Sequence, residues 1–395
     1  MAALARRGAS RLRRDEHGAV GVMAALARRG ASRLRRDERG AIGVIVAVLL
    51  GAGVLTGMGA LVIDVGQLYQ ERAELQNGAD AAALGVAKTC VLGFCGPGVA
   101  VQYADANASG LTSGVAGVSL VCGSGAGLAI CPGSSGKLTD CPPPVGPNYV
   151  NVYTATKTGS GATLLPPAFG RALLGSSYRG TSVLACAQAT WGAPTAATTI
   201  ALTISACEWD QATSQGSNFA PPPPYPPDPT PSPFLDQRLV LNSATGTGCA
   251  SEPAGADEAG TFSWIAKPRG SCLTAVNPPT IAGRTRTRVS YSCQLLLQNS
   301  QNNATPLLVP IYVASSGGGS PSYSLKGFAE FVVTGYNLDA GSFSPNFFAQ
   351  DWLNGSNTCS GSTYCIDGFF THGVIPSTGS WNGVDLGAAE IDLTG

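Results

Sequence analysis

The side chains that most often carry out chemistry are few in this chain of 395 residues, and they are widely spaced. His17 and His372 are the two histidines, and His372 lies between apolar residues in the segment FFTHGVIP. Outside the N-terminal head, a Ser/His/Asp triad would need His372, and a zinc site built on two histidines is excluded. We interpret His372 as a structural or loop residue.

Carboxylates and glycine-rich loops give no stronger indication of catalysis. The segment EWD at 208–210 is the tightest acidic cluster outside the helix described below, and a structural or binding role suits it better than paired acid/base chemistry. The glycine-rich segment at 122–136 lacks the Lys-Ser/Thr pair of a phosphate loop. We therefore expect no catalytic residue, no cofactor and no metal.

Cysteines are the one reactive side chain that is abundant. The chain has 12, an even number, and all of them lie after an apolar stretch that ends at residue 63. No CxxC pair occurs, so neither a zinc ribbon nor a thioredoxin-type site is supported, and disulfides outside the cytoplasm are predicted. We expect Cys359 to pair with Cys365, and pairing among Cys249, Cys272 and Cys293. The remaining candidates are Cys90, Cys95, Cys122, Cys131, Cys141, Cys186 and Cys207.

The composition indicates which elements hold these side chains. Only 12% of residues are charged, about half of the usual share of roughly 25%. The 52 Gly and 27 Pro favour long loops and β-structure over a helical bundle, and the length allows two or three domains. Charge is uneven, because residues 1–40 hold eleven Arg and four acidic residues, a net charge of +7, and the remainder carries −7.

The segment Ala41–Ile63 contains 23 residues and no charge. About 20 apolar residues of helix cross the hydrocarbon core of a bilayer, whereas a secretory signal has an apolar region of only about 7–15. We expect an uncleaved transmembrane helix; cleavage before Leu61 and a buried core helix are the alternatives. The Arg-rich head then lies on the cytoplasmic side. It has no aromatic residues on which bases could stack, so nucleic acid is not expected as a partner.

The helical pattern continues beyond the span without a proline. We expect one helix from Ala41 to Lys88, roughly 70 Å long at about 1.5 Å per residue. Glu71 and Glu74 should lie off its apolar stripe, and Gln70 on its outer face. The stripe has 3-4 spacing and consists of Val65, Leu68, Arg72, Leu75, Ala79, Ala82 and Val86. We expect Leu68, Leu75, Ala79, Ala82 and Val86 to form the seam on which the next domain packs.

The same region resembles the N-terminal part of the TadE/TadG-like proteins of tight-adherence (Flp) pilus assembly. That family has an Arg-rich head, an apolar span, an Asp-x-Gly-x-x-Tyr step and a Leu-Gln-x-x-Ala-Asp-Ala-Ala-Ala-Leu run. The stretches 201–213 and 323–336 look similar to TadG-related proteins of actinobacteria. The motif positions here are Asp64, Gly66, Tyr69, Leu75, Gln76, Ala79, Asp80, Ala81, Ala82, Ala83 and Leu84.

The resemblance implies an assembly protein that keeps its head. Substrates of the prepilin peptidase carry Gly before the cut and Glu five residues after it, whereas here Gly40 is followed at that distance by Ile45. Residues 1–22 are repeated almost unchanged as 23–44, which we interpret as a duplication or an early start site without its own role. Larger relatives carry an Asp-x-Ser-x-Ser metal motif, and this sequence has none.

The expected fold class is α+β. A cytoplasmic head (1–40) and a transmembrane helix (41–63) precede a pilin-like helix with a small α+β domain (64–193). A β-rich sandwich or barrel (194–395) follows, with strands that include 286–297 and 388–395 and a proline-rich insertion at 220–234. Short helices are expected at 101–110 and 167–175.

The predicted function is a membrane-anchored accessory protein of pilus assembly, outside the cytoplasm beyond residue 63, with other pilus proteins as partners. The main alternative is a cell-surface adhesin or ligand-binding protein on a pilus-type anchor, which would show an exposed apolar or aromatic patch within 194–395. A secreted hydrolase is the third; it would need a cleft that holds His372 beside a Ser and a carboxylate.

Overall fold

The structure is a computed structural model that describes residues 41–108, 115–133, 140–157, 164, 167, 169, 177–223, 235–241, 262–284, 288–316, 321–339, 347–353, 355 and 364–395. The head 1–40, most of the expected helix at 167–175, and residues 224–234 of the proline-rich insertion lie outside the described residues. The chain divides into two compact units, Met1–Leu68 with Pro166–Gly180, and Tyr69–Leu165 with Thr181–Gly395.

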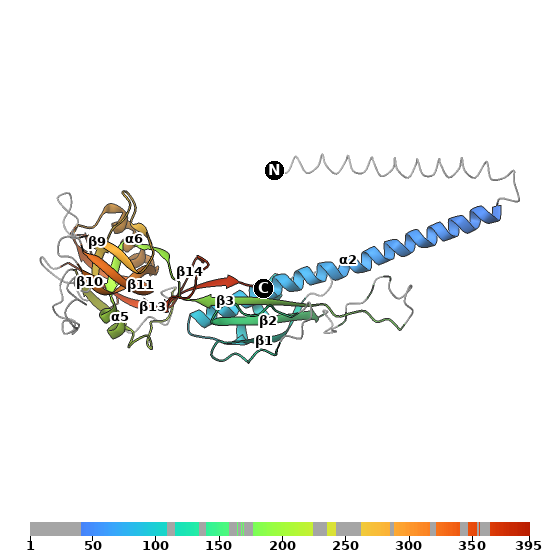
Figure 1. Ribbon diagram of the computed structural model, residues 1–395, viewed down its shortest axis with the longest axis horizontal. Helices are drawn as coiled ribbons and strands as arrows, with labels where there is room; N and C mark the ends of the chain where they lie inside the picture. The colour runs from blue at the N-terminus through green and yellow to red at the C-terminus, as the bar shows by residue number, and fades with distance from the viewer. Residues whose placement is uncertain are drawn as a thin grey trace. The chain divides into compact units, whose positions relative to one another are not determined.

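Helix α2, Ala41–Val91, is continuous through the end of the first unit and the start of the second (Figure 1). The single helix expected from Ala41 to Lys88 is therefore present. Within the described residues, no helix is both long enough and apolar enough to cross a membrane.

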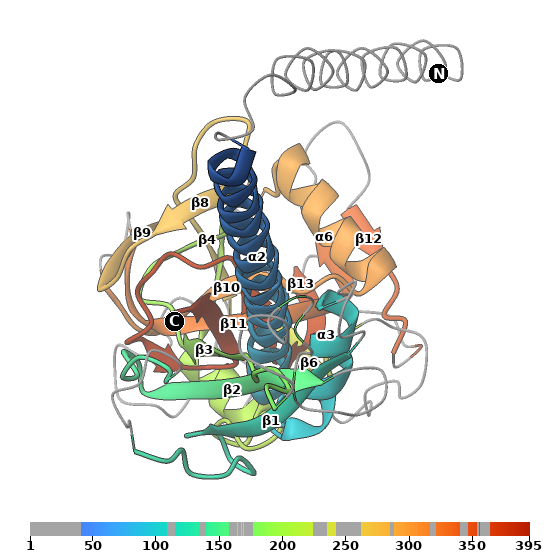
Figure 2. The same cartoon turned by 90° about the vertical axis from the view of Figure 1, so that its right-hand side faces the viewer.

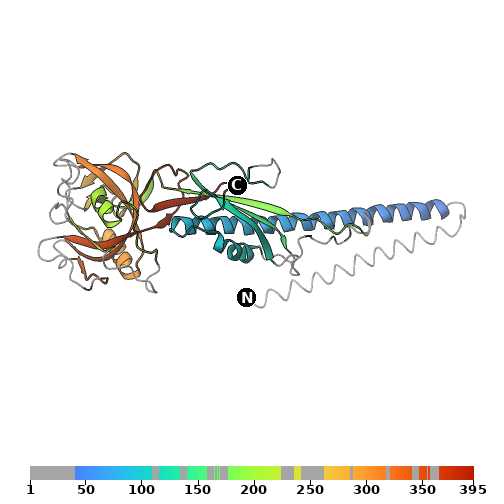
Figure 3. The same ribbon diagram turned by 90° about the horizontal axis from the view of Figure 1, so that it is seen from below.

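The part of α2 in the second unit lies along a five-stranded sheet with the order β1-β2-β3-β16-β14 (Figure 3). A 3-10 turn, η2 (Pro97–Val99), leads into helix α3 (Ala100–Asn107), which contacts β1 (Figure 2). The short helix predicted at 101–110 is thus confirmed. The strands are β1 (Val115–Gly123), β2 (Asn148–Lys157), β3 (Leu184–Gly192), β14 (Gly373–Ile375) and β16 (Ala388–Leu393).

The last strand of this sheet comes from the end of the sequence. Strand β16, the red strand beside β3 in Figure 1, pairs antiparallel with β3. Glu390 lies opposite Gly192 in this pairing. Strand β14 adds to it in parallel. We expected 388–395 among the strands of the C-terminal β-rich domain, and the structure places it instead on the free edge of β3. An edge strand exposes unpaired N–H and C=O groups, and β16 satisfies them.

A second, larger sheet accounts for the β-rich character of the rest of the chain, as predicted. Its order is β10-β5-β7-β9-β11-β13-β6, and β10 also pairs with β11. The path from β10 through β5, β7 and β9 to β11 therefore closes on itself as a small barrel, and β13 and β6 extend the sheet beyond β11. The strands are β5 (Leu202–Ser205), β6 (Gln237–Val240), β7 (Phe262–Ile265), β9 (Thr280–Arg284), β10 (Leu307–Ser316), β11 (Ser322–Leu338) and β13 (Cys365–Thr371).

Smaller elements complete this part. Strands β12 (Phe347–Ala349) and β15 (Val384–Asp385) pair with β11, and β4 (Ala197–Ile200) pairs with β8 (Leu273–Val276). The core contains Tyr312 and Tyr323, whose ring centroids lie 5.0 Å apart. The Tyr323 hydroxyl donates to Ser263 Oγ at 2.8 Å, so its polar end is satisfied inside the core.

One expected strand is a helix in the structure. Tyr291–Asn303, within and beyond the strand predicted at 286–297, forms helix α6. Its buried residues Cys293, Leu297 and Ser300 follow the i, i+4, i+7 spacing of one helix face. The three consecutive leucines in this segment made that spacing hard to recognise in the sequence. Ala206–Ala212 forms helix α5, and the Ser205 Oγ at its N-cap accepts a hydrogen bond from Glu208 N.

Candidate functional site

The C-terminal half of the motif packs α2 onto the sheet. Leu75 is 1% exposed, and Ala79, Ala82 and Ala83 are fully buried. Alternate residues of a strand share one face, so the small side chains of β3 line the surface that α2 contacts. Small apolar side chains on both surfaces let the helix pack close to the sheet. The residues of the sheet in this cluster are Val150, Val152, Ala185, Ala187 and Ala189.

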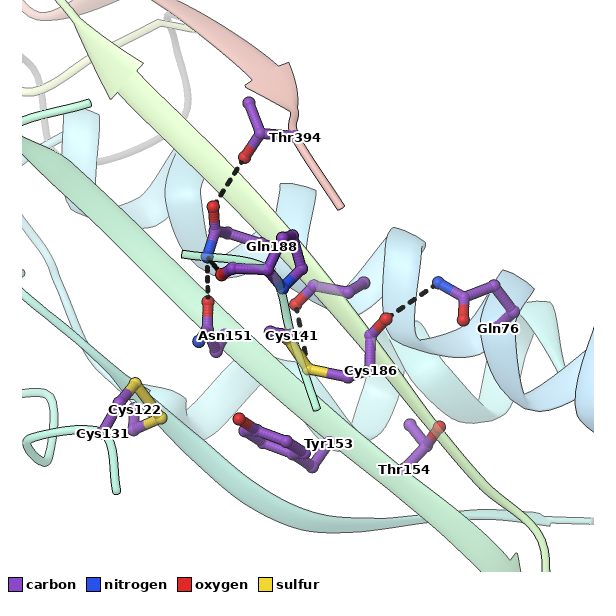
Figure 4. Close-up of a disulfide and its surroundings, with 12 residues drawn as sticks. Gln76, Cys122, Cys131, Cys141, Asn151, Tyr153, Thr154, Cys186, Gln188 and Thr394 are labelled. Carbon is purple, nitrogen blue, oxygen red and sulfur yellow. Dashed lines mark hydrogen bonds between the residues drawn. A yellow bond between two sulfur atoms is a disulfide. The ribbon is translucent and has the colours of Figure 1, made fainter. Parts of the chain in front are cut away.

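Polar motif residues add hydrogen bonds between α2 and the strands (Figure 4). Gln76 Nε2 donates to Asp80 Oδ1 at 2.8 Å and to the Cys186 carbonyl at 3.0 Å. Thr154 Oγ1 on β2 donates to the Leu75 carbonyl at 2.9 Å. The spacing of four positions between Gln76 and Asp80 is visible in the sequence. The second partner of Gln76, 110 residues away, is not.

A buried amide joins the neighbouring strands. Gln188 Nε2 donates to Asn151 Oδ1 and to the Pro142 carbonyl, both at 2.9 Å. The Thr394 hydroxyl donates to Gln188 Oε1 at 2.9 Å (Figure 4). This one side chain thus links β2, the segment before it and the end of the chain, which a buried polar group needs in order to avoid an unsatisfied donor or acceptor.

The expected apolar stripe of α2 is wrong at one position, where the charged residue that faces the sheet is Glu71 and not Arg72. Arg72 is exposed and Glu71 is fully buried, whereas we placed Arg72 on the stripe and Glu71 outside it. A helix has 3.6 residues per turn, so position 71 is four residues before Leu75 and position 72 is three residues before it. The spacing allowed both, and charge gave no way to choose. Gln70 is exposed, as expected.

The N-terminal part of the motif makes fewer contacts within the chain. Tyr69 is 73% exposed, and a Cβ added to Gly66 would meet no atom within 4 Å. Leu84 is 37% exposed on the far side of the seam. The motif therefore divides into residues that hold this chain's own sheet and residues that leave a helical surface open.

Asp64 belongs to neither group. Both of its carboxylate oxygens accept from the backbone N–H of Phe169, at 3.0 and 3.2 Å, within the first unit. The motif aspartate thus holds a segment 105 residues away in sequence.

Disulfides occur throughout the described part of the second unit, which confirms the expectation of oxidised cysteines. The bonds are Cys90–Cys95, Cys122–Cys131, Cys141–Cys186 and Cys272–Cys293. The last joins two members of the expected trio. Cys207 and Cys365 are also disulfide-bonded, and Cys249 and Cys359 lie outside the described residues.

The EWD cluster is divided by its helix. Glu208 is 1% exposed, whereas Asp210 Oδ1 lies 3.4 Å from Lys326 Nζ. The Trp209 indole donates from Nε1 to the Leu386 carbonyl at 3.0 Å. Lys326 Nζ lies 5.0 Å from the centre of the same ring. These contacts hold the end of the chain onto the barrel and do not form an acid/base pair.

A carboxyl pair that no sequence pattern indicates lies beside β11. Asp236 Oδ1 accepts from Thr334 Oγ1 at 2.8 Å, and its carboxyl group also hydrogen-bonds to that of Asp351. Burial, together with the hydrogen bond and the charge of Asp351, raises the pKa of Asp236 to about 8. Burial likewise raises the pKa of Asp367 to about 6, against the effect of Arg238, whose Nε lies 2.9 Å from Asp367 Oδ1.

His372 lies in a cleft with a carboxylate, Asp385, but no serine is among the described residues that line this cleft. Its ring packs at 4.0 Å between centroids on Phe219. Burial lowers the pKa of His372, and the Asp385 carboxylate opposes that effect. Across the described ranges, no group of three or more His, Cys, Asp or Glu side chains could hold a metal ion.

Residues 40–89 match the family model described as "Putative Flp pilus-assembly TadE/G-like". The matched range contains every motif residue from Asp64 to Leu84 and ends two residues before α2 does. The match supports involvement in Flp pilus assembly and suggests association with pilus components. No curated protein and no solved structure matches the chain.

Proposed function

We propose that this chain is a membrane-anchored accessory protein of Flp pilus assembly, with a structural or interaction role and no catalytic activity. Its partners are the membrane and other pilus-assembly or pilin-like proteins. Within the family we place it nearest the TadG-related proteins of actinobacteria, because of the stretches 201–213 and 323–336, which here form β5 with α5 and most of β11.

The observation that carries this proposal is the division of the motif along α2. Residues from Leu75 to Ala83 are used to hold the chain's own sheet. The turns before them expose Tyr69 at 73%, with Leu61 at 58%, Val62 at 69% and Val65 at 40%. Exposed apolar surface of this extent on one helix is typical of a site that meets lipid or other helices. The buried part of α2 holds the folded domain, and the exposed part before it is free to contact other proteins of the pilus assembly or lipid.

The sequence supports the anchor and the topology. The 23 uncharged residues Ala41–Ile63 are long enough for a bilayer core, and the flank before them carries +7. This arrangement keeps the N-terminus in the cytoplasm and exports residues 64–395. The disulfides of the second unit suit an oxidising compartment outside the cytoplasm.

The absence of catalysis is part of the proposal. His372 and Asp385 share a cleft, yet a nucleophile beside them is missing among its described lining residues. Burial raises the pKa of Asp236, whose carboxyl group hydrogen-bonds to the 1% exposed Asp351, and we assign this pair a structural role.

Two tyrosines of equal exposure give a matched test. Tyr69 and Tyr291 are both 73% exposed, but only Tyr69 belongs to the motif. In a strain that lacks the gene, Tyr69→Ala should restore the level of membrane-bound protein but not the pili counted by electron microscopy. Tyr291→Ala should restore both.

Equal pilus numbers with Tyr69→Ala and with the parent chain would refute a role for the exposed helix surface. Normal piliation in the strain without the gene would refute the proposed function as a whole.

A further inference from the structure

A pocket of about 350 Å³ lies where the end of α2, the ends of β2 and β3, and the loop before β16 meet. Its volume is at the lower end of the range of roughly 300–1,000 Å³ for small-molecule sites. It plays no part in the pilus-assembly role proposed above. Its aromatic and polar lining side chains include Asn148, Trp191, His372, Trp381, Asn382 and Asp385.

The lining combines flat aromatic rings with planar hydrogen-bonding groups. Two tryptophans, Trp191 and Trp381, supply the rings. The amides of Asn148 and Asn382 each offer donors and an acceptor, and the Asp385 carboxylate accepts. Because burial lowers the pKa of His372, its imidazole is neutral near pH 7 and can both donate and accept.

Charge narrows the class of ligand. Neither Lys nor Arg occurs among the described residues that line the pocket, so nothing there would neutralise a phosphate or a carboxylate. The one charged group is Asp385, one of whose oxygens, Oδ1, already accepts from Gly387 N at 3.0 Å. A ligand with many hydroxyl groups and an apolar face fits this set better than an anion does.

The loop that carries Trp381 and Asn382 is held in place before any ligand arrives. The Glu390 carboxylate is fully buried and accepts from Thr378 Oγ1 at 2.6 Å, from Thr378 N at 2.8 Å, and from Ser377 Oγ and Gly379 N, both at 3.2 Å. Thr195 N donates to the Ser380 carbonyl at 3.0 Å. A loop fixed by this many bonds loses little entropy on binding.

Two glycines allow Trp381 to lie close to the sheet. A Cβ added to Gly192 would lie 2.6 Å from the Trp381 carbonyl oxygen, and one added to Gly146 would lie 3.0 Å from its Nε1. Only glycine at these positions lets the indole come so close to the sheet. Trp381 remains partly exposed there, and Asn382 and Asp385 are exposed.

We propose that this pocket binds a neutral saccharide. One face of a sugar ring carries C–H groups that pack on an indole, and its hydroxyl groups pair with amides and a carboxylate. The chain would then attach to glycans in addition to its role in assembly. A small cation such as choline is the competing ligand, since aromatic rings and a carboxylate also attract ammonium groups.

The test uses the purified full chain in a detergent without a sugar headgroup. Glucose, galactose, mannose, N-acetylglucosamine and their disaccharides are titrated up to about 10 mM, ten times the concentration that half fills a millimolar site. Glucose 6-phosphate and choline are titrated in parallel. Calorimetry should detect at least one neutral sugar, which binds more tightly than the phosphate or choline.

Variants assign the binding to this pocket. Trp381→Ala should raise the dissociation constant at least about tenfold, the equivalent of about 1.4 kcal/mol. Asn382→Ala, an exposed position outside the core, should raise it about threefold and keeps the test valid if Trp381→Ala does not fold. Phe348→Ala removes an aromatic that is 49% exposed on β12 and should change it less than about twofold.

The proposal is overturned if no neutral sugar binds, if choline or the sugar phosphate binds more tightly, or if both pocket variants bind like the parent. None of these results depends on pilus formation, so the proposed function is tested separately.

Discussion

The hydroxyl of Thr154 donates a hydrogen bond to the backbone carbonyl of Leu75, at 2.9 Å, across the interface between β2 and α2. Thr154 is fully buried and Leu75 is 1% exposed, so this bond is shielded from water. It fixes α2 along its axis at Leu75, where the buried part of the seam begins, because Leu68, the first expected seam residue, is only half-buried. The seam and this bond together set the register of the helix on its sheet.

The first prediction concerns that seam. Leu75→Asp would place a charge in a fully packed site, and should cost more than the roughly 1.5–3 kcal/mol that burying a leucine contributes. Gln70→Asp changes an exposed side chain that donates to Glu74 Oε1 at 3.2 Å, and should alter the unfolding free energy by less than about 0.5 kcal/mol. Denaturant unfolding of the two proteins and the level of folded protein in cells measure the difference. Equal stability would mean that the seam does not hold the domain.

A second prediction concerns the disulfides. In the chain-entropy model, a bond that closes 45 residues contributes about 4 kcal/mol, and one that closes 5 residues about 2 kcal/mol. Replacing Cys141 and Cys186 by serine should therefore destabilise the protein more than replacing Cys90 and Cys95. Thermal unfolding without reductant compares the two double variants. A larger loss for Cys90 and Cys95 would contradict the loop-length argument.

The pH dependence of stability is the third prediction. The pKa of Asp236 is raised from 3.8 to about 8, so the folded state holds a proton that the unfolded state releases. Its contribution to stability is complete below about pH 4 and is lost as the pH rises towards 8. Glu330, whose pKa burial raises from 4.5 to about 7, acts in the same direction.

Asp236→Asn tests this directly. The amide can still donate to Asp351 and accept from Thr334 Oγ1 but has no proton to lose, so stability should fall less between about pH 5 and pH 8. Asp339→Asn, at a carboxylate 3.9 Å from Arg288, is the control and should keep the slope of the parent. Denaturant midpoints at four pH values give both slopes. A slope for Asp236→Asn equal to that of the parent would show that Asp236 keeps its charge when folded.

Topology is the subject of the fourth prediction. With the +7 head in the cytoplasm, protease added to intact spheroplasts should digest residues beyond 64 and spare the head. Immunoblots against tags at the two ends of the chain measure this. A cytoplasmic marker protein that remains intact shows that the cells are sealed. Full protection of the C-terminal tag would rule out the proposed orientation.

Local pattern was sufficient to predict α2, α3 and the β-rich class, because periodicity and proline-free length are properties of neighbouring residues. It was insufficient for α6, where three consecutive leucines fit a buried strand as well as a helix. It also gave no sign of the bond from Gln76 to Cys186 or of the pair Asp236 and Asp351, whose members are 110 and 115 positions apart. Contacts of that range depend on which distant segments the topology brings together. No local pattern in a single sequence reveals those segments.

Glu71 shows the same limit at the scale of one residue. A step of three or of four leads equally well from Leu68 to the next turn, and both candidate residues, Glu71 and Arg72, are charged. Only the packed sheet decides which of the two adjacent side chains, Glu71 or Arg72, is buried.

The position of β16 has a consequence for biosynthesis. Residues 193–372 are an insertion between β3 and the strands β14 and β16 that complete its sheet. When β3 emerges during synthesis or export, its partner for one edge has not yet been made, so that edge stays open while about 200 further residues appear. Pairings this distant in sequence slow folding. The sheet can therefore close only after the whole insertion, barrel included, has been synthesised.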